Sequence, residues 1–366
     1  MNRRIFLLST CAAAGLRAQD DAAAHIDRLG GKFQRDSNGQ IIGVDLSDSW
    51  ANDADVRSLA QISTLQEIDL SRTRITGKGL EPLAKLQNVA VLKLQFAEFL
   101  TATDMGHLAE WKNLRALDLR GTRVDSGVFE RLAAHRSLEF VDISSTEVDD
   151  EGFEELAALI KLRELRCGAN RLSGVALTVL KTIPALRSLD VGGYQRVDSG
   201  LWGLALNEQN LGRLGGLTRL EALTLRGAKL ADRGSDRPGS ELAIKKEIVG
   251  LDSLAPLTNL KALDLGDLPI KSEDLTWLPA LTALEQLDID GPFQIDDAVA
   301  GTLLKLGSLK RLNLAGTLLT DAALNQLAGM MTLERLIVGG TQVTTGAVAA
   351  FARKRPDCRV ISWSAA

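Results

Sequence analysis

The stretch Leu114-Arg115-Ala116-Leu117-Asp118-Leu119-Arg120-Gly121-Thr122-Arg123-Val124 recurs almost unchanged along the chain, and this recurrence decides the fold. Twelve copies can be aligned, and their first positions are Ile41, Leu65, Val89, Leu114, Leu138, Leu162, Leu186, Leu220, Leu260, Leu284, Leu309 and Leu333. The steps are 24 or 25 residues, except for 34 before Leu220 and 40 before Leu260. Such a repeat predicts one elongated body built from like units, with insertions in two neighbouring repeats.

The residue spacing within each copy predicts a strand followed by a short helix. Apolar residues at positions one, four and six enter a core, while the residues between them face outward. After a turn, an acidic residue precedes apolar residues at three- and four-residue spacing, as in 148–156 and at Thr320-Asp321, which predicts a capped helix start. Because helices are wider than strands, stacked units predict an α/β solenoid, a right-handed horseshoe with a concave parallel sheet and convex short helices.

Polar residues mark the turns and both ends of the array. The ninth position is polar, and its side chain is expected to bond the turn backbone, at Thr73, Thr122, Thr146, Asn170, Thr317 and Thr341. Asn38-Gly39 before Ile41 predicts a hairpin. We therefore expect an N-terminal cap of a helix and a hairpin strand over 19–40, repeats over 41–345 with insertions near 206–215 and 231–246, and a C-terminal cap over 346–366.

Residues 1–18 have the layout of an export signal: basic residues, a short apolar run and a small residue before Gln19. The apolar run is too short to span a membrane. Arg3-Arg4-Ile5-Phe6-Leu7 also resembles the bacterial twin-arginine signal, and an ordinary secretion signal is the equal alternative. The sequence thus predicts an exported protein, periplasmic or secreted, with no transmembrane segment.

Composition and cysteines narrow the classes further. A net charge of -4 gives no reason to expect nucleic acid as a partner. Cys167 occupies a strand core position, and Cys358 lies about seven strands away, roughly 34 Å at about 4.8 Å per strand, which is too far for a disulfide. We expect a monomer held together by repeat stacking.

The repeat resembles the bacterial leucine-rich repeats of about 24 residues that are related to the ribonuclease-inhibitor class, particularly the GALA type. The resemblance covers residues 41 to about 345. It implies a non-enzymatic recognition scaffold that binds a protein through the concave face. GALA effectors also resemble F-box proteins at their N-terminus, whereas only about twenty residues precede the first strand after residue 18, which argues against an F-box adaptor.

An acidic stripe is expected along the sheet. The middle outward strand position is aspartate in seven copies: Asp45, Asp69, Asp118, Asp142, Asp190, Asp264 and Asp288. Such a row would attract a basic partner, although aspartate is also part of the repeat's own consensus, and we favour that structural reading. Beside it, small residues are expected to leave a groove open: Ser47, Ser71, Ser144, Gly168, Gly192, Gly266, Ala315 and Gly339.

The two insertions are further candidates, because solenoids often place specificity in inserted loops, although each could equally be a harmless surface excursion. The residues expected to contact the partner are Asp69, Lys93, Asp118, Arg120, Phe140, Asp142, Arg166, Asp190, Tyr194, Arg226, Asp232, Arg233, Asp236 and Arg237. The alternative function is a cell-envelope structural or glycan-binding module, which would need exposed aromatic residues. Trp50, Trp111, Trp202, Trp277 and Trp363 are expected to fill the core or the caps.

Motifs for chemistry are not found. Residues 234–240 have the glycine spacing of a phosphate loop without its lysine, and none of the three histidines has a cysteine or histidine neighbour at metal-ligand spacing. We therefore expect no catalytic, cofactor-binding or metal site. An enzyme with a site across the insertions ranks last among the hypotheses.

Overall fold

The structure is a computed structural model that describes residues 20–193, 195–197, 200–230, 249–291 and 294–363. The chain forms two compact units. Unit 1 comprises Met1–Leu165 with Ile183–Ala185, and unit 2 comprises Arg166–Thr182 with Leu186–Ala366. The predicted export signal at 1–18 lies outside the described residues, as does the insertion at 231–246.

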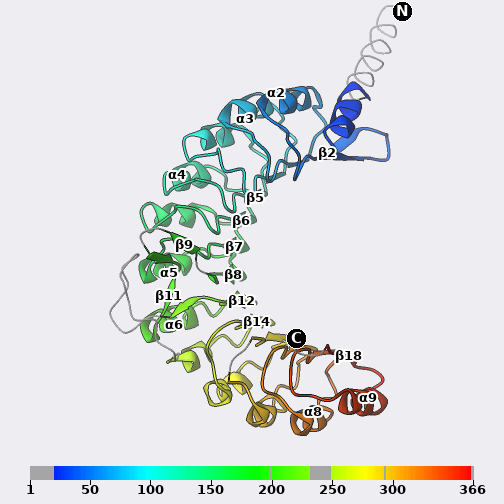
Figure 1. Cartoon of the computed structure of the whole chain (residues 1–366). Coiled ribbons are helices and arrows are strands. Elements are labelled where there is room, and N and C mark those ends of the chain that lie inside the picture. The colour runs from blue at the N-terminus through cyan, green and yellow to red at the C-terminus, as the bar shows by residue number, and fades with distance from the viewer. Residues whose placement is uncertain (1–19, 194, 198–199, 231–248, 292–293, 364–366) are drawn as a thin grey trace, which may run out of the picture. The chain divides into compact units, whose positions relative to one another are not determined.

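Unit 1 stacks short strands on one side and short helices on the other (Figure 1). It begins with a helix over 20–28, and β1 (Lys32–Arg35) then pairs antiparallel with β2 (Ile41–Asp45) in the predicted hairpin. Parallel strands follow: β3 (Glu67–Asp69), β4 (Val91–Lys93), β5 (Ala116–Asp118), β6 (Phe140–Asp142) and β7 (Glu164–Arg166), which ends at the boundary of the unit. The helices, with 3₁₀ helices labelled η, are α2 (Asp53–Val56), η1 (Arg57–Gln61), α3 (Gly77–Leu83), η2 (Asp104–Glu110), α4 (Val128–Ala133) and η3 (Phe153–Ala158).

Unit 2 repeats this arrangement. Its parallel strands, in spatial order, are β8 (Ser188–Asp190), β12 (Ala222–Thr224), β14 (Ala262–Asp264), β15 (Gln286–Asp288), β16 (Arg311–Asn313), β17 (Arg335–Ile337) and β18 (Arg359–Ile361). Its helices are α5 (Gly174–Leu180), α6 (Glu208–Gly215), η4 (Leu251–Leu254), η5 (Ser272–Leu275), η6 (Leu278–Ala280), η7 (Asp297–Val299), α7 (Ala300–Leu303), α8 (Asp321–Leu327) and α9 (Thr345–Lys354).

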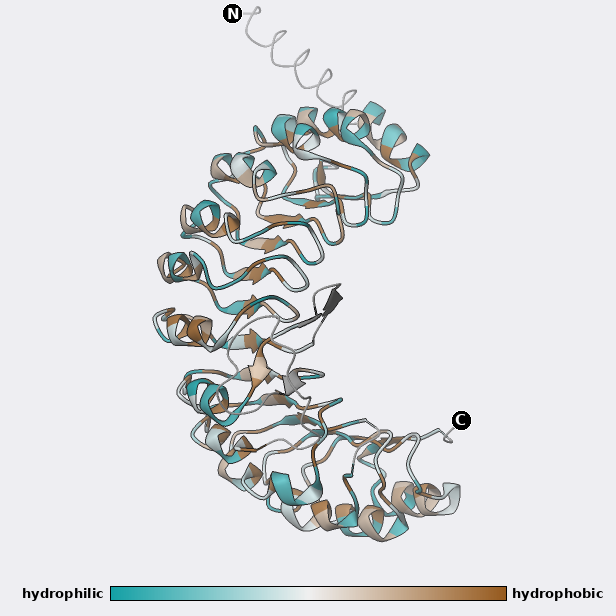
Figure 2. Cartoon of the chain, turned by 60° about the vertical axis from the view of Figure 1, so that its left-hand side comes forward, coloured by the Kyte–Doolittle hydropathy of each residue, from teal (hydrophilic) through white to brown (hydrophobic). Residues whose placement is uncertain are grey.

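The core of each unit lies between its strands and its helices. The leucines of the repeat are buried as predicted; Leu114, Leu117 and Leu119 have no exposed surface. Figure 2 shows the strands of both units largely in brown, the colour of hydrophobic residues. Cys167 and Cys358 are buried and are not disulfide-bonded. No helix of the described segments is long and apolar enough to cross a membrane.

Threonine hydroxyls close the turns after the strands. Thr122 Oγ1 donates to the carbonyl of Leu119 at 2.6 Å, and Asn170 Nδ2 donates to the carbonyl of Cys167 at 3.2 Å. The same bond occurs at Thr73, Thr146, Thr317 and Thr341. The structural role predicted for the ninth position is confirmed.

A second set of hydrogen bonds joins neighbouring repeats where the helices begin. Thr76 donates to the carboxylate of Asp53 twice, from its backbone N–H and from its hydroxyl, at 2.7 Å each. The same pair of hydrogen bonds joins Thr320 to Asp297 and Thr344 to Asp321, again across 23 residues of sequence. We call these pairs the repeat interlocks. Each satisfies a backbone donor at one helix start with a side chain of the previous repeat.

The acidic helix cap predicted at Thr320-Asp321 was wrong in its residue, because Thr320 and not Asp321 caps the helix. Thr320 Oγ1 accepts from the backbone N–H of Ala322 at 3.2 Å and so caps α8. Asp321, one residue later, accepts from Thr344 of the next repeat instead. Spacing alone does not separate these two roles, because both residues can cap a helix.

The first insertion lies earlier than predicted. Residues 208–215 form α6, which packs against α5 and η4 and buries Leu211 and Leu214. The extra residues precede it as an antiparallel pair, β9 (Gln195–Val197) and β10 (Gly200–Trp202), and as β11 (Ala205–Leu206), which pairs with β13 (Lys229–Leu230). The prediction near 206–215 was wrong because α6 is an ordinary helix of its repeat.

Candidate functional site

The outward side chains of the strands form what we call the sheet face of each unit. Apart from β18, whose Val360 is half-buried, each described three-residue strand of the stacked repeats buries its middle residue and turns the other two outward. In unit 1 the register aligns one row as Gly43, Glu67, Val91, Ala116 and Phe140, and another as Asp45, Asp69, Lys93, Asp118 and Asp142.

Aspartates of the stripe accept hydrogen bonds from the backbone that follows them. Oδ1 accepts from the N–H two residues later at 3.0 Å for Asp69 and Asp118 and at 2.8 Å for Asp142. In unit 2, Asp190 and Asp264 do the same at 2.9 Å. These bonds end the strands, as local side-chain bonds of aspartate do.

Two aspartates of the stripe, Asp118 and Asp142, are too deeply buried to contact a partner. Asp118 is only 6% exposed and Asp142 only 2% exposed. Gln95 Nε2 also donates to Asp118 Oδ2 at 2.5 Å. Their carboxylates are covered by neighbouring side chains and are engaged in the turns, so they are structural residues.

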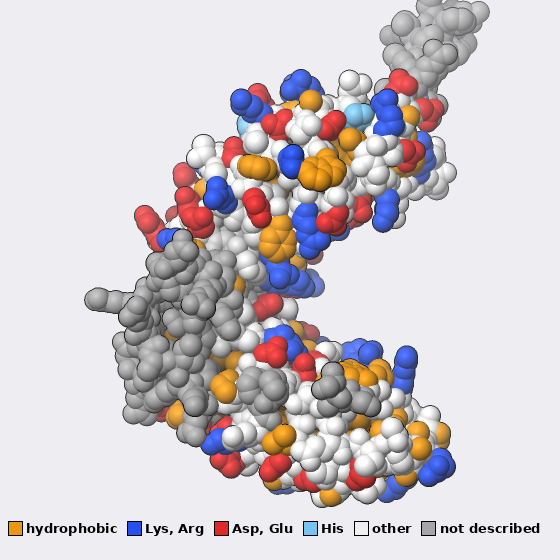
Figure 3. Space-filling model, viewed as in Figure 1, with side chains coloured by type: hydrophobic (Ala, Val, Ile, Leu, Met, Phe, Trp, Pro, Cys, Tyr) orange, Lys and Arg blue, Asp and Glu red, His pale blue; other side chains and the backbone are white. Residues whose placement is uncertain are grey.

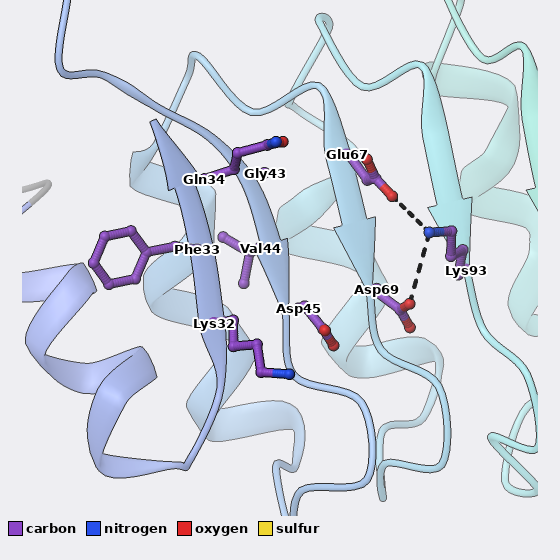
Figure 4. A pocket seen from close by; sticks show the side chains of 9 residues that line it. All are labelled: Lys32, Phe33, Gln34, Gly43, Val44, Asp45, Glu67, Asp69 and Lys93. Atoms are coloured by element: carbon purple, nitrogen blue, oxygen red, sulfur yellow. Dashed lines mark hydrogen bonds and ion pairs between the residues drawn. The ribbon is translucent and has the colours of Figure 1, made fainter. Parts of the chain in front are cut away.

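A hollow of about 300 Å³ lies on the sheet face of unit 1 across β1 to β4 (Figure 4). It forms at Gly43, which has no side chain in the row where β3 carries Glu67. Lys93 Nζ lies 2.6 Å from Glu67 Oε1 and 3.9 Å from Asp69 Oδ2. The hydrogen bond with Glu67 raises the pKa of Lys93, so this side chain stays cationic. Two predicted contact residues, Asp69 and Lys93, thus line one hollow.

Phe96 is a surface residue that the sequence analysis missed. Its φ is +52°, in the left-handed region, as at the equivalent position of every other repeat. That position is glycine in six copies, including Gly121, and five further copies carry Asp48, Arg72, Ser145, Ala169 and Asp267 with a similar φ. Phe96 is the one aromatic residue among them. The signal was present in the sequence, because Phe96 stands where the quoted stretch has Gly121.

Two arginines flank the Phe96 ring. The guanidinium carbons of Arg72 and Arg120 each lie 5.6 Å from the ring centroid, within cation–π range. The ring also lies against Gly121, where an added Cβ would come within 2.2 Å of it. Figure 3 shows orange and blue side chains next to one another on the face of unit 1 that is in view. We call Arg72, Phe96 and Arg120 the arginine–phenylalanine cluster.

In unit 2, Arg226 binds three aspartates. Nε lies 2.9 Å from Asp264, Nη1 lies 3.1 Å from Asp267, and Nη2 lies 2.5 Å from Asp290. The hydrogen bond to Asp290 is the main cause of the raised pKa of Arg226. Burial raises the pKa of Asp264 even though Arg226 donates to it. Arg226, predicted to contact a partner, has its charge satisfied within the unit.

The expected groove over small residues is filled at two places. An added Cβ at Gly266 would meet the Arg226 guanidinium at 2.3 Å, and one at Gly339 would meet the Trp363 ring at 2.0 Å. Glycine is needed at these positions because side chains of this chain lie over them. The groove is therefore not continuous.

The remaining predicted contact residues divide into two groups. Phe140 is half-buried and Arg166 is exposed on their strands, and Asp190 is half-buried in β8. The others, Tyr194, Asp232, Arg233, Asp236 and Arg237, lie outside the described residues.

The tryptophans divide between core and surface. Trp111 is fully buried and donates to the carbonyl of Leu83 at 3.0 Å, and Trp202 is buried beneath Arg171. In contrast, Trp50 is 74% exposed and Trp363 is 55% exposed. The expectation that all the tryptophans fill the core or the caps was therefore wrong for these two. Among the described residues, no group of three or more His, Cys, Asp or Glu could hold a metal ion.

Comparisons with known proteins agree on the repeat. A family profile described as leucine-rich repeat matches residues 61–84 and 134–157. A comparison with curated proteins gives no match. An internalin of Listeria monocytogenes has a TM-score of 0.56 at 17% identity, covering 93% of this chain and 94% of that chain.

Two further solved structures are similar at lower scores. A leucine-rich repeat protein of Leptospira interrogans has a TM-score of 0.37 at 16% identity, covering 83% of this chain and 85% of that chain. The ectodomain of the Arabidopsis receptor kinase HAESA, solved with an IDA peptide hormone, has a TM-score of 0.46 at 18% identity, covering 95% of this chain and 53% of that chain. The repeated sequence, the profile matches and the internalin-like fold together identify the chain as a leucine-rich repeat protein with an α/β solenoid fold.

Proposed function

We propose that this protein is an exported, non-enzymatic recognition scaffold that binds a protein partner through its sheet face and the inserted loops of the central repeats. Leucine-rich repeat folds typically serve as protein-interaction scaffolds, because stacked repeats present extended surfaces. The export signal at 1–18 and the insertion at 231–246 enter this proposal from the sequence alone.

The observation that carries the proposal is the arginine–phenylalanine cluster, in which the guanidinium groups of Arg72 and Arg120 each lie 5.6 Å from the Phe96 ring. The positive φ of Phe96 is shared by the eighth position of every repeat, where six of the twelve residues are not glycine, so it belongs to the repeat and does not mark a site. What distinguishes Phe96 is its side chain, because it is the one aromatic residue among these twelve positions.

The composition of the cluster suits a protein interface. Aromatic residues and arginine are enriched among the residues that dominate binding energy. The two cation–π contacts hold the three side chains in place before a partner arrives, which lowers the entropy lost on binding. Lys93 and Asp69 of the nearby hollow would extend the same contact surface.

The test is affinity capture from the envelope and medium of the producing cell, with the mature protein compared with Phe96→Gly. Glycine occupies the equivalent position in other repeats, so the free energy of unfolding is expected to remain within about 1 kcal/mol of the original. Captured partner is expected to fall at least tenfold. Arg131→Ala, on the exposed side of α4, is the matched control.

Deleting residues 232–246 in a second variant tests the inserted loop. A partner lost with the deletion and with Phe96→Gly supports both parts of the surface, and one lost only with Phe96→Gly restricts recognition to the sheet face. A partner retained by Phe96→Gly but lost with Arg131→Ala would refute the proposed face.

A further inference from the structure

Three arginines stand in register on the last strands of unit 2. Arg311, Arg335 and Arg359 occupy the same position on β16, β17 and β18 and are aligned with one another. All three are exposed, and none forms an ion pair with another described residue. Adjacent strands lie about 4.8 Å apart, so the row spans about 10 Å. We call these three residues the arginine ladder.

Another row of charged residues in unit 2 forms ion pairs between neighbouring repeats. One position earlier in the repeats, charges alternate along Arg187, Glu221, Lys261, Glu285 and Lys310. Lys261 lies 2.7 Å from Glu221, Lys310 lies 3.0 Å from Glu285, and Arg187 lies 3.9 Å from Glu221. Like charges directly opposite on neighbouring strands destabilise a sheet. The arginine ladder thus retains a repulsion that the neighbouring row avoids.

An apolar strip adjoins the arginine ladder. Where β14, β15 and β16 carry Asp264, Asp288 and Asn313, the next two strands carry Ile337 and Ile361. Both isoleucines are on the outward face and only half-buried.

Trp363 extends the strip. Its ring lies over Gly339, and its carbonyl accepts from the N–H of Gly340 at 2.8 Å. More than half of the side chain nevertheless remains exposed. In the view of Figure 3, hydrophobic and basic side chains lie side by side in the region where Figure 1 labels β18.

We propose that the arginine ladder and the adjoining strip bind an acidic segment of a partner protein, with carboxylates on the arginines and an apolar side chain on Trp363. This inference rests on the proposed function and names the chemistry of the partner. Guanidinium groups bind carboxylates in paired hydrogen bonds, and the partner would remove the repulsion within the ladder. A nucleic acid would use the charges but leave the apolar strip without a counterpart.

The acidic stripe predicted from the sequence suggested a basic partner instead. That expectation weakens because Asp118 and Asp142 are buried and Asp264 is paired with Arg226. Among the outward strand positions that the structure describes in unit 2, the exposed charges without an ion pair are the arginines of the ladder.

The first test measures fluorescence anisotropy of a labelled synthetic peptide, Gly-Glu-Glu-Leu-Glu-Glu-Leu-Gly, with the full chain. Arg335→Glu, in the middle of the ladder, is expected to weaken binding about tenfold, the equivalent of about 1.4 kcal/mol. Arg353→Glu changes charge equally on exposed α9 and is expected to change affinity less than twofold. Trp363→Ala is expected to weaken binding without changing its salt dependence.

Specific outcomes would overturn the inference. Equal binding by Arg335→Glu and Arg353→Glu would do so, as would equal binding of a peptide with glutamine in place of glutamate. A single-stranded oligonucleotide that competes as well as the peptide would assign the ladder to nucleic acid instead. A dimer that dissociates in Arg335→Glu would assign it to a second copy of this chain.

The capture experiment separates this inference from the proposed function. A partner that is lost with Phe96→Gly but retained with Arg335→Glu would leave the function standing and remove the arginine ladder from it. A folding readout is also available: Arg335→Gln is expected to raise Tm by about 1–2 °C in low salt, and not in high salt.

Discussion

Replacing Arg226 with methionine removes the central cation of three ion pairs in unit 2. The carboxylates of Asp264 and Asp290 are 23% and 22% exposed, and that of Asp267 is 54% exposed. Partly buried pairs of this kind contribute about 1 kcal/mol each, between the values for exposed and for buried pairs. An exposed pair contributes about 0.5 kcal/mol, within the range measured for exposed pairs. We therefore expect Arg226→Met to lower the free energy of unfolding by about 2–3 kcal/mol at neutral pH.

This loss should depend on pH. Burial already raises the folded-state pKa of Asp264 above its ordinary value of 3.8, and removing Arg226 would raise it further. An acid whose folded pKa is raised holds its proton more tightly when folded, so stability falls as pH rises from the unfolded pKa through the folded pKa. The loss should be complete near neutral pH and less than half as large near pH 3.8, where the carboxyl group of Asp264 is substantially protonated in both states.

Urea unfolding followed by circular dichroism at both pH values measures this difference. Lys305→Met, on the exposed side of unit 2, is the control and should change stability by less than about 0.5 kcal/mol. Arg226→Lys keeps the charge but lacks the planar fork, so it should recover only part of the loss. A loss below about 0.5 kcal/mol, or one of equal size at both pH values, would refute the assignment of these contacts as stabilising ion pairs.

Three further changes test unit 1 by urea unfolding. Leu117→Ala should cost about 2–5 kcal/mol through the cavity it leaves, whereas Ile160→Ala, at an exposed site, should cost little; equal losses would contradict the core assignment. Asp142→Lys should lower the free energy of unfolding by about 2–4 kcal/mol, because it buries a new charge and removes the carboxylate that accepts a hydrogen bond in the turn. A decrease no greater than that of Lys93→Met would contradict a structural role for this carboxylate. Burial lowers the pKa of His135 below 6.5, so the contribution of the neutral imidazole to stability is lost as pH falls through the folded pKa. His135→Asn should therefore make the free energy of unfolding fall less between pH 7 and pH 5. An unchanged pH dependence would contradict this.

The repeat spacing predicts the fold because it is a local property of the sequence. Leu114, Leu117 and Leu119 alternate as a strand requires, and Asn38-Gly39 predicts its hairpin without any long-range information. The first insertion was misplaced because residues 208–215 contain apolar positions that fit either a loop or a helix, and only packing against α5 and η4 decides between them.

The candidate site was harder to predict because its side chains meet across repeats. Arg226 and Asp290 are 64 residues apart, and their contact depends on the stacking of β12, β14 and β15. Strand alternation correctly turned Asp142 outward, but it could not show that neighbouring side chains cover the carboxylate. Phe96 and the arginine ladder were visible as residues, yet the contacts of Phe96 with two arginines and the lack of ion pairs at the ladder are properties of the folded chain.

The repeat interlocks restrict how such a chain can change in length. Because Asp53 and Thr76 belong to different repeats, a break between two interlocked repeats leaves a carboxylate on one side and a threonine on the other, each without its partner. In unit 2, where Thr320 and Asp321 are adjacent and take part in two successive interlocks, gain or loss of a whole repeat joins an aspartate to the next threonine again, whereas a shift of a few residues does not. There the interlocks therefore favour length changes by complete repeats and direct irregular additions to the turns between them.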